Sequence, residues 1–434
     1  MTTAGAKDIS QRDFFTDESL LADPYPYYEA LRAKCPVHQE PNHGVLAITG
    51  YDEAVDVYRD PVTFSACNSP TGPFPGVQVP PGTDDASEAI EAARDRLPMG
   101  RDLPTLDPPE HTRARGLMMR LLTPRRLKEN EAYIRRLADQ LIDDLAARRA
   151  CEFIHDFADP FSFLVIADLL GVPDEDRWRL HDERLARMEQ AGAIGEINRL
   201  RTANPQAYLH EAFAAYVEDR RRNPRDDVLT AMANATYPDG STPPTSDVVR
   251  TAAFLFVAGQ ETTVRHLAFA AQAIAEHPHI QEILRREPDR IPNFVEEMLR
   301  LESPIKANFR LARHSTEVAG LEVPAGTPLM FLNGAINRDP RHFENPDQLD
   351  IDRPNARHHL AFGQGVHSCP GAPLARTEGR IAMERLLARL RDITVSDAAH
   401  GPAGDRHYEY VPTYLFRGTK ALHLEYTPAE AEDG

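Results

Sequence analysis

One uninterrupted stretch, residues 245–277, limits the possible folds more than any other part of the sequence. The chain holds 36 prolines among its 434 residues, yet this stretch has none, and its single glycine is Gly259. A helix of this length extends about 50 Å and must cross the whole molecule, because each residue adds about 1.5 Å. Its middle, residues 252–258, is apolar on nearly every face, which predicts burial. A polar run from Gln260 to Thr263 follows directly, and polar groups in a buried helix need a specific reason.

The rest of the sequence predicts one mainly helical domain with a small β region. Helical patterns fill residues 110–222 and 372–391, and short strand-like runs separated by turns follow Pro304. Residues 408–426 predict a hairpin. No internal repeat or linker is visible, so we expect a single domain over residues 1–434.

Residues 69–108 stand apart because they combine many prolines and glycines with an acidic stretch. A segment of this length and composition inside an enzyme is usually a lid or a binding loop. The alternative is a disordered excursion on the surface. We expect a lid-like loop.

Composition excludes several classes of function. The chain carries 49 Lys and Arg against 67 Asp and Glu, a formal charge of −18, and nucleic-acid binding needs a concentrated basic surface. The four cysteines include no CxxC pair and do not suggest a disulfide framework, which fits a reducing compartment. The N-terminal residues lack the apolar region of a signal peptide, and no apolar run reaches the length of a membrane span. We therefore expect a cytoplasmic protein without a membrane anchor.

The strongest chemical motif is the glycine-rich stretch FGQGVHSCPG, residues 362–371, around Cys369. Its glycines allow tight turns and close approach of the backbone to a flat ligand. Free backbone N–H groups in such a loop, together with the N-terminus of the following helix, favour a thiolate. Two alternatives remain from the residues alone. One is a buried, inert cysteine. The other is a nucleophile paired with His367, although side chains two residues apart in an extended loop point to opposite sides.

This motif is similar to the haem-thiolate loop of the cytochrome P-450 family, FGxGxHxCxG, and matches it at every fixed position. The resemblance extends over nearly the whole chain, from DPYPYYEALR at residues 23–32 to the RG at 417–418. It implies the mainly α cytochrome P-450 fold and a haem b cofactor, with Cys369 as the proximal ligand of the iron. It also implies that Phe362 packs beside the haem and that His367 hydrogen-bonds a propionate. A thiolate ligand favours O–O cleavage.

The polar centre of the long stretch gains a role through the same resemblance. A carboxylate next to a hydroxyl can hold water and relay protons, but a threonine hydroxyl also commonly bonds back to its own helix. The segment AGQETT, residues 258–263, resembles the family's AGx(D/E)T(T/S) signature. Glu261 and Thr262 would then be the catalytic acid–alcohol pair that delivers protons to bound dioxygen. Family members that run on peroxide alone often lack this pair, so its presence favours a reductase-driven monooxygenase.

Three further positions resemble the family's propionate contacts. His111 and Arg115 are four residues apart, near a predicted helix start, and by themselves indicate a solvated basic face. The family uses this placement to hold a haem propionate, and Arg310 resembles the arginine that reaches the propionates from a β-strand. Several donors suit two carboxylates, because buried charges must be paired.

The motif Glu297-x-x-Arg300 is selected by its position. Residues three apart share a helix face, but the same spacing recurs at several other places in the chain. This copy lies in an EEMLR run about 70 residues before the cysteine loop, as in the family. The resemblance implies that it pairs with Arg353 and stabilises the fold.

Substrate contacts are expected, by resemblance only, from the 69–108 loop, from the region of Gly192, and from six residues: Phe254, Val257, Ala258, Lys306, Asn308 and Leu415. Lys306 is unusual in a position that is more often apolar. It either extends to solvent along its apolar stem or meets a polar or anionic group of the substrate.

The resemblance implies a monooxygenase that inserts one oxygen atom from O₂ into a hydrophobic small molecule, a hydroxylation. Electrons would come from a ferredoxin with its NAD(P)H reductase, because the chain shows no flavin domain or NAD(P) fingerprint, and we expect a monomer. An acidic ferredoxin would dock on six arginines, unless these form local ion pairs: Arg113, Arg120, Arg125, Arg126, Arg376 and Arg380. The alternatives are a haem protein that only binds or senses a ligand and, more distantly, a cysteine hydrolase.

Overall fold

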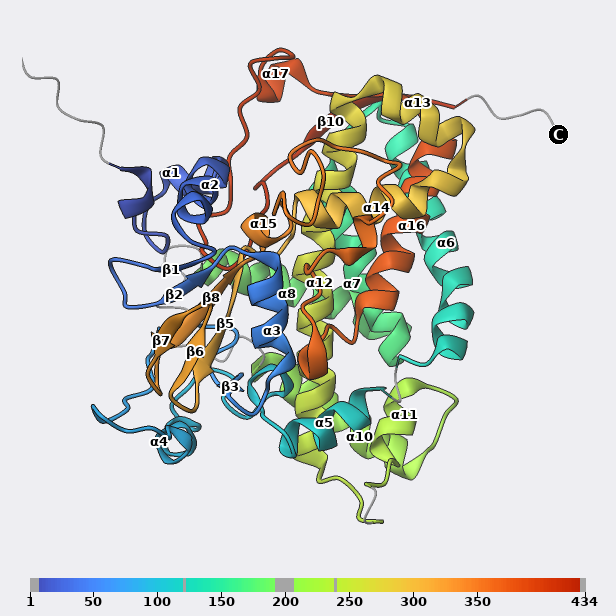
Figure 1. The fold of residues 1–434 in the computed structure, drawn as a ribbon. Helices are drawn as coiled ribbons and strands as arrows, with labels where there is room; N and C mark the ends of the chain where they lie inside the picture. Colours follow the sequence, from blue (N-terminus) through green and yellow to red (C-terminus); the bar gives the residue numbers. More distant parts are fainter. Residues whose placement is uncertain (1–7, 120–121, 192–206, 238–239, 430–434) are drawn as a thin grey trace, which may run out of the picture.

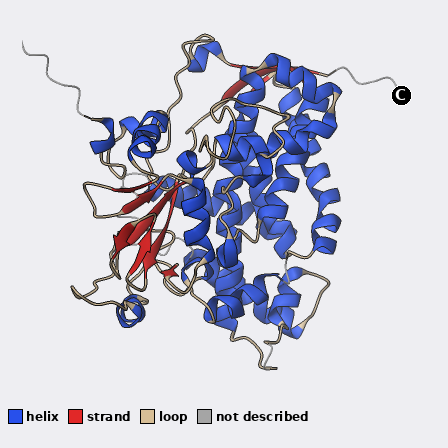
Figure 2. Cartoon of the chain, in the orientation of Figure 1, coloured by secondary structure: helices blue, strands red, loops and turns tan. Residues whose placement is uncertain are grey.

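The computed structural model describes residues 8–119, 122–191, 207–237 and 240–429. Helices make up most of the molecule, and most of the strands gather on one side of it, at the left in Figure 2, while further strands lie at the top. None of the helices in these ranges is long and apolar enough to cross a membrane. The mainly α fold with a small β region is therefore confirmed.

The long helix is α12 (Thr245–Glu276), which matches the predicted stretch to within one residue. It ends where Pro278 begins α13 (Pro278–Arg286), since a proline cannot continue the hydrogen bonding of the preceding helix. It runs through the main core and is covered by α7 (Asp159–Leu170), α10 (Ala207–Arg222), α14 (Ile291–Leu301) and α16 (Ala372–Arg389). Figure 1 shows it passing through the centre of the helical part.

Charged pairs fix how α6 (Pro124–Ala146) lies beside α16. Glu131 pairs with Arg380 at 3.1 Å, Arg135 with Glu384 at 2.8 Å, and Asp139 with Arg385 at 2.6 Å. The residue numbers rise together along both helices, so the two helices run parallel. The start of α6 therefore lies beside the start of α16, directly after Cys369.

The main sheet has the strand order β1-β2-β8-β5-β3. Strands β2 and β8 pair in parallel, and the other neighbours pair antiparallel. The bounds are β1 (Val37–Gln39), β2 (Leu46–Ile48), β3 (Phe64–Ser65), β5 (Ala307–Ala312) and β8 (Pro328–Leu332). A second sheet has the order β4-β10-β9, from β4 (Ala150–Glu152), β9 (Leu390–Val395) and β10 (His423–Pro428), and β6 (Thr316–Val318) pairs with β7 (Leu321–Val323).

The remaining helices cover the sheet and the two ends of the helical part (Figure 1). In chain order they are α1 (Ser19–Ala22), α2 (Tyr25–Lys34), α3 (Tyr51–Arg59), α4 (Ser87–Ala93), α5 (Glu110–Met119), α8 (Asp174–Ala191), α11 (Val228–Ala233), α15 (Asn333–Ile336) and α17 (Asp397–His400). A second core, rich in aromatic side chains, joins the N-terminal segment to β5 and to the 414–415 segment. We call it the aromatic core.

The 69–108 segment is ordered at its C-terminal end by Asp107, whose carboxylate is buried. Asp107 accepts hydrogen bonds from Ser65 Oγ at 2.6 Å and from Arg94 Nη2 at 3.0 Å, and it pairs with Arg313 at 2.6 Å. The segment also contains α4. The alternative of a disordered excursion is therefore wrong, whereas the role as a lid stays a prediction.

Two predicted boundaries are wrong. The helix expected over residues 372–391 ends at Arg389, because Leu390 begins β9 and pairs with β10. The hairpin expected over residues 408–426 is reduced to one bridge between Tyr410 and Thr419, and residues 423–428 form β10 instead. Both errors come from pairing with distant strands.

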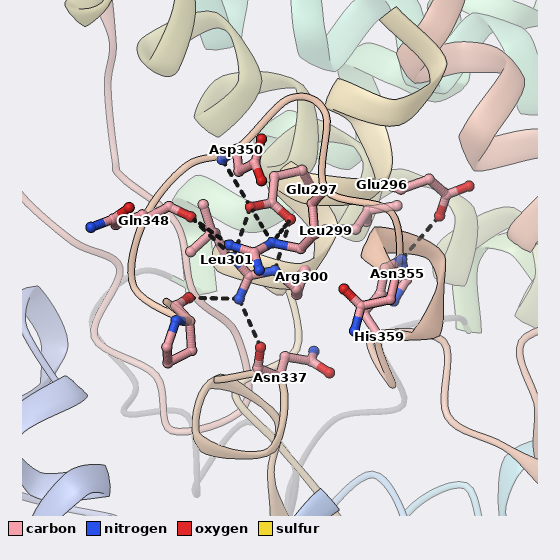
Figure 3. Close-up of polar contacts among 12 residues, drawn as sticks. Glu296, Glu297, Leu299, Arg300, Leu301, Asn337, Gln348, Asp350, Asn355 and His359 are labelled. Carbon is pink, nitrogen blue, oxygen red and sulfur yellow. Dashed lines mark hydrogen bonds and ion pairs between the residues drawn. The ribbon is translucent and has the colours of Figure 1, made fainter. Parts of the chain in front are cut away.

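The predicted ion pair of Glu297, Arg300 and Arg353 is confirmed and forms a buried network (Figure 3). Glu297 and Arg300 have no exposed side-chain surface. Arg300 donates to both Glu297 oxygens, at 2.7 and 2.8 Å, and Arg353 donates to the same carboxylate at 3.0 Å. The guanidinium of Arg300 also donates to the carbonyl oxygens of Asn337 and Pro346. This network ties α14 to the segment that precedes the cysteine loop.

We expect Arg300→Ala to lower the free energy of unfolding by about 3–5 kcal/mol, because it leaves Glu297 buried beside a single arginine. Urea unfolding followed by circular dichroism measures this loss. The control is Arg290→Ala, which removes partly exposed pairs with Glu287 and Asp352 and should cost less than about 1 kcal/mol. Equal losses in the two variants would contradict a special role for the buried network.

Candidate functional site

The two motifs meet where α12 packs on α16. The side chains of Thr263 and Glu378 are hydrogen-bonded to each other. One turn later His266 lies against Gly379 so closely that a Cβ on the glycine would stand 2.9 Å from His266 Nε2. Glu378 is six residues beyond Ala372, about 9 Å along the helix. The polar centre of α12 therefore lies close to the cysteine loop, which ends where α16 begins.

The middle of α12 has an accessible strip on one face, although the helix around it is buried. Phe254, Val257, Ala258, Glu261 and Thr262 are partly or fully accessible, whereas most residues between and after them are buried. Spacings of three and four residues place side chains on one face of a helix. We call these five residues the accessible strip. It contains both predicted catalytic residues and three of the six predicted substrate contacts.

The cysteine loop is shaped by its glycines. Gly363 and Gly365 have φ angles of +63° and +74°, values that favour glycine. A Cβ on Gly365 would stand 2.4 Å from the carbonyl oxygen of Tyr58, so the glycine lets the loop rest against α3. Within the loop, the Cys369 N–H donates to the carbonyl oxygen of Phe362 at 2.8 Å.

Cys369 combines an enclosed position with an open face. Burial raises the pKa of its thiol, while hydrogen bonds from the backbone N–H groups of Gly371 and Ala372 and the positive charges of Arg115 and Arg376 act to lower it. The side chain nevertheless keeps an accessible surface. Both observations hold if the sulfur faces accessible space inside the molecule. The alternative of a packed, inert cysteine is therefore wrong.

The predicted propionate contacts gather into one cluster. The rings of His111 and His367 lie 4.0 Å apart between centroids. Burial, followed by the charge of Arg115, lowers the pKa of His111 to about 4; burial, followed by the charge of Arg310, lowers the pKa of His367 to about 2. Each histidine is therefore neutral at pH 7.

This cluster is rich in donors and poor in acceptors. His111 Nδ1 and His367 Nε2 are buried and have no hydrogen-bond partner among the described residues. Arg310 donates to Ser69 Oγ at 3.3 Å and to the carbonyl oxygen of Phe309 at 2.7 Å, and within the described ranges neither it nor Arg115 forms an ion pair with a carboxylate. Unpartnered buried polar atoms are costly unless a ligand satisfies them. The cluster therefore suits a ligand that carries carboxylates.

At the C-terminal end of the accessible strip, Glu261 pairs with Arg265 one turn later. The Thr262 hydroxyl donates to the carbonyl oxygen of Ala258 at 3.2 Å, which is the bond back to its own helix considered above. A hydroxyl that donates one bond still has lone pairs to accept another. The two side chains can therefore hold a water molecule and exchange protons with it.

The cysteine–histidine nucleophile receives no support from the geometry. The His367 ring lies against His111, and no hydrogen bond joins His367 to Cys369 within the described ranges. The side chains of His367 and Cys369 therefore contact different groups, as expected for two residues that are two positions apart in an extended loop.

The other predicted substrate contacts lie outside the accessible strip of α12, and their role stays a prediction. Lys306 is only 3% exposed; its Nζ donates to the carbonyl oxygen of Thr413 at 3.3 Å and lies 5.3 Å from the ring centroid of Phe14. The expectation that Lys306 extends to solvent is wrong, because it contacts the aromatic core. Leu415 is buried in that same core, Asn308 accepts a hydrogen bond from the Tyr58 hydroxyl at 2.8 Å, and Gly192 lies outside the described residues.

Sequence reasoning missed four buried polar residues around the site. Burial raises the pKa of Glu378 to about 8 against the opposing hydrogen bond with Thr263. In the part of the chain that the structure describes, neither ring nitrogen of His266 has a hydrogen-bond partner, and burial lowers the pKa of His266 to about 4. Glu296 and His359 form a pair described below. No pattern in the sequence separates these residues from ordinary surface residues, because their burial depends on which helix faces meet.

Comparison with known proteins agrees with this geometry. A family profile described as Cytochrome P450 matches residues 186–399. Cytochrome P450 109 from Bacillus spizizenii is 31% identical over 409 residues, which cover 93% of this chain and 92% of the relative. The substrate-free structure of cytochrome P450 CYP150A6 from Mycobacterium marinum is 51% identical, covers 97% of this chain and 100% of its own, and superimposes with a TM-score of 0.91. CYP109E1 from Bacillus megaterium in complex with testosterone is 26% identical with a TM-score of 0.77, over 93% of this chain and 99% of its own.

Proposed function

We propose, from the premise that this chain belongs to the cytochrome P450 family, that Cys369 is the residue through which this monooxygenase ligates the iron of haem b. Members of the family bind haem b through a cysteine thiolate. The observation that carries the assignment is the open face of Cys369, whose sulfur accepts two backbone N–H groups. Backbone donors and nearby cations stabilise a thiolate.

The donor cluster completes the fit to haem b. His111, Arg115, Arg310 and His367 would hold the two propionates, which supply the acceptors that this cluster lacks. Phe362 would lie beside the haem, since its carbonyl oxygen is bonded to the Cys369 N–H. When bound, the haem supplies the redox-active iron for oxygen chemistry, and thiolate ligation favours O–O cleavage.

The chain's own contribution to turnover is proton delivery. Glu261, paired with Arg265, has a side chain that is about one third exposed, so water can reach its carboxylate. It takes up a proton, and the Thr262 hydroxyl holds the water that passes the proton on. A protein that only binds or senses a ligand has no need of this pair, so the pair favours turnover.

The proposed substrate is a hydrophobic small molecule. The part of the accessible strip that precedes the acid–alcohol pair is apolar, with Phe254, Val257 and Ala258 on its surface. Apolar lining with few polar groups is typical of sites for apolar ligands. The structure of the relative CYP109E1 contains testosterone, which is consistent with an apolar substrate for this chain. Insertion of one oxygen atom into a C–H bond of such a substrate would produce a hydroxyl group.

The proposed electron donor is a ferredoxin that docks beside the start of α16. Of the six arginines expected there, Arg125, Arg376 and Arg380 are paired with glutamates, Arg113 lies over the ring of Tyr237, and Arg120 lies outside the described residues. Local pairing therefore weakens most of that patch. Arg126 and Lys128 keep their charge without an ion pair among the described residues, and the parallel packing of α6 on α16 puts them near the end of the cysteine loop.

We expect Cys369→Ser to lose the absorption of the reduced carbon monoxide complex at about 450 nm that gives the family its name. Serine is a poor thiolate substitute, so the band should move to shorter wavelength. Difference spectra measure this change. Cys35→Ser, at another accessible free cysteine, is the control and should keep the band; an unchanged spectrum in Cys369→Ser would refute the assignment.

We expect Thr262→Ala and Glu261→Gln to retain haem but to divert electrons to peroxide, because a placed proton donor is worth ~10²–10⁴-fold in rate. Product formed per NADPH consumed measures the coupling. Thr251→Ala is the matched control, since its hydroxyl makes the same bond to the carbonyl four residues earlier, at 2.8 Å to Asp247, without belonging to the accessible strip. Full coupling of NADPH consumption to product formation in both variants would show that Glu261 and Thr262 do not deliver protons.

We expect Arg126→Glu combined with Lys128→Glu to slow reduction by an acidic ferredoxin and to remove its salt dependence, because attraction between exposed charges is screened by salt. Stopped-flow reduction measures both effects, while reduction by dithionite should not change. Lys420→Glu, a reversal at an exposed residue of the 419–422 segment, is the control. If the double variant is reduced by ferredoxin at the wild-type rate, and if that rate does not depend on salt, the donor docks elsewhere.

A further inference from the structure

Glu296, the residue before Glu297, has a buried carboxylate that the proposed chemistry does not use. It is only 4% exposed. Three side chains donate to it: His359 at 3.1 Å, Arg376 at 2.6 and 3.1 Å, and Arg357 at 3.2 Å. Burial acts to raise the pKa of Glu296, but the hydrogen bonds of His359 and Arg376 outweigh it and lower the pKa to about 2. The carboxylate is therefore ionised at neutral pH.

The first arm of this network runs through His359 to the entrance of the cysteine loop. Figure 3 shows the His359 ring directed at Glu296. The other ring nitrogen, Nδ1, accepts the backbone N–H of Ala361 at 3.2 Å. An acceptor at Nδ1 requires the proton at Nε2, where it is donated to Glu296. The carboxylate thereby fixes the tautomer of His359 and the position of the residue before Phe362.

The second arm runs through Arg376 to Phe362, the first residue of the cysteine loop. Its guanidinium is held by two hydrogen bonds to Glu296 and lies 4.7 Å from the ring centroid of Phe362. His359 faces the same ring, with 5.6 Å between the centroids. The positive charge of Arg376 is among the groups that lower the pKa of Cys369. Two-point pairing gives an arginine a defined place that a single contact does not.

We propose that Glu296 is a positioning residue for the iron-ligating cysteine: it holds His359 and Arg376 against Phe362, and so fixes both the cysteine loop and the place of the Arg376 charge. The inference rests on the proposed role of Cys369. Glu296 itself need not touch the sulfur. The sequence analysis expected Arg376 to take part in ferredoxin docking. In this proposal its role is instead to support the cysteine loop.

Because Arg376 is positively charged, the proposed role of Glu296 predicts the direction in which the reduction potential changes. A nearby cation stabilises the reduced centre, because reduction adds negative charge, so Arg376→Gln should lower the reduction potential. If Glu296 positions Arg376, Glu296→Gln should lower the potential too. If Glu296 acted only as a distant negative charge, its neutralisation would raise the potential. The two explanations therefore predict opposite signs for one variant.

The experiment is a spectroelectrochemical titration of the haem-loaded wild type, Glu296→Gln, Arg376→Gln and the double variant. We expect both single variants to make the equilibrium constant for reduction smaller, by about tenfold for Arg376→Gln, and the double variant to fall no further than Arg376→Gln alone. Glu302→Gln is the matched control. It lies next to the end of α14 and also binds two arginines, Arg417 at 2.5 Å and Arg338 at 3.5 Å, without contacting the cysteine loop, and should keep the wild-type potential.

A rise in potential in Glu296→Gln, or a wild-type value, would overturn the inference. Should that variant fail to fold, Arg376→Lys carries the test. It keeps the charge but loses the two-point pairing, and we expect a potential between those of the wild type and Arg376→Gln; a wild-type value would overturn the inference. If instead the wild type itself lacks the long-wavelength carbon monoxide band, the role of Cys369 fails, and that result is distinct from a failure of the positioning role alone.

Discussion

The close packing of α12 on α16 is the contact on which the rest of the site depends. Thr263 meets Glu378 and His266 meets Gly379 across this interface, so the strip on α12 and the loop before α16 face the same region. About one hundred residues separate the two motifs along the chain. Without this contact, the acid–alcohol pair and the cysteine would be unrelated features of two helices.

Two adjacent glutamates on α14 hold the cysteine loop and the segment that precedes it. Glu297 binds Arg300 and Arg353 and stabilises the segment before the cysteine loop, whereas Glu296 binds His359 and Arg376 and reaches the loop itself. Consecutive residues on a helix point about 100° apart, so one short helix can hold two different segments. Both carboxylates are buried, and each is matched by more than one donor, as buried charges require.

Local constraints explain what the sequence could predict. The length of α12 follows from a stretch without proline, and the shape of the cysteine loop follows from glycines such as Gly365, whose positive φ and contact with Tyr58 exclude other residues. What could not be predicted depends on distant partners. Arg376 finds its carboxylate 80 residues earlier in the chain, Lys306 is buried by Phe14 and Thr413, and the start of β9 is set by β10.

The missing side chain at Gly379 acts as a spacer between the two halves of the site. A methyl group there would press on Nε2 of the buried His266 ring, so either that ring or α12 would have to move away from α16. If α12 moved, the distance between α12 and the cysteine loop would increase as a result. The width available to a planar ligand held between the accessible strip and the cysteine loop would thus depend in part on one absent carbon atom, at Gly379.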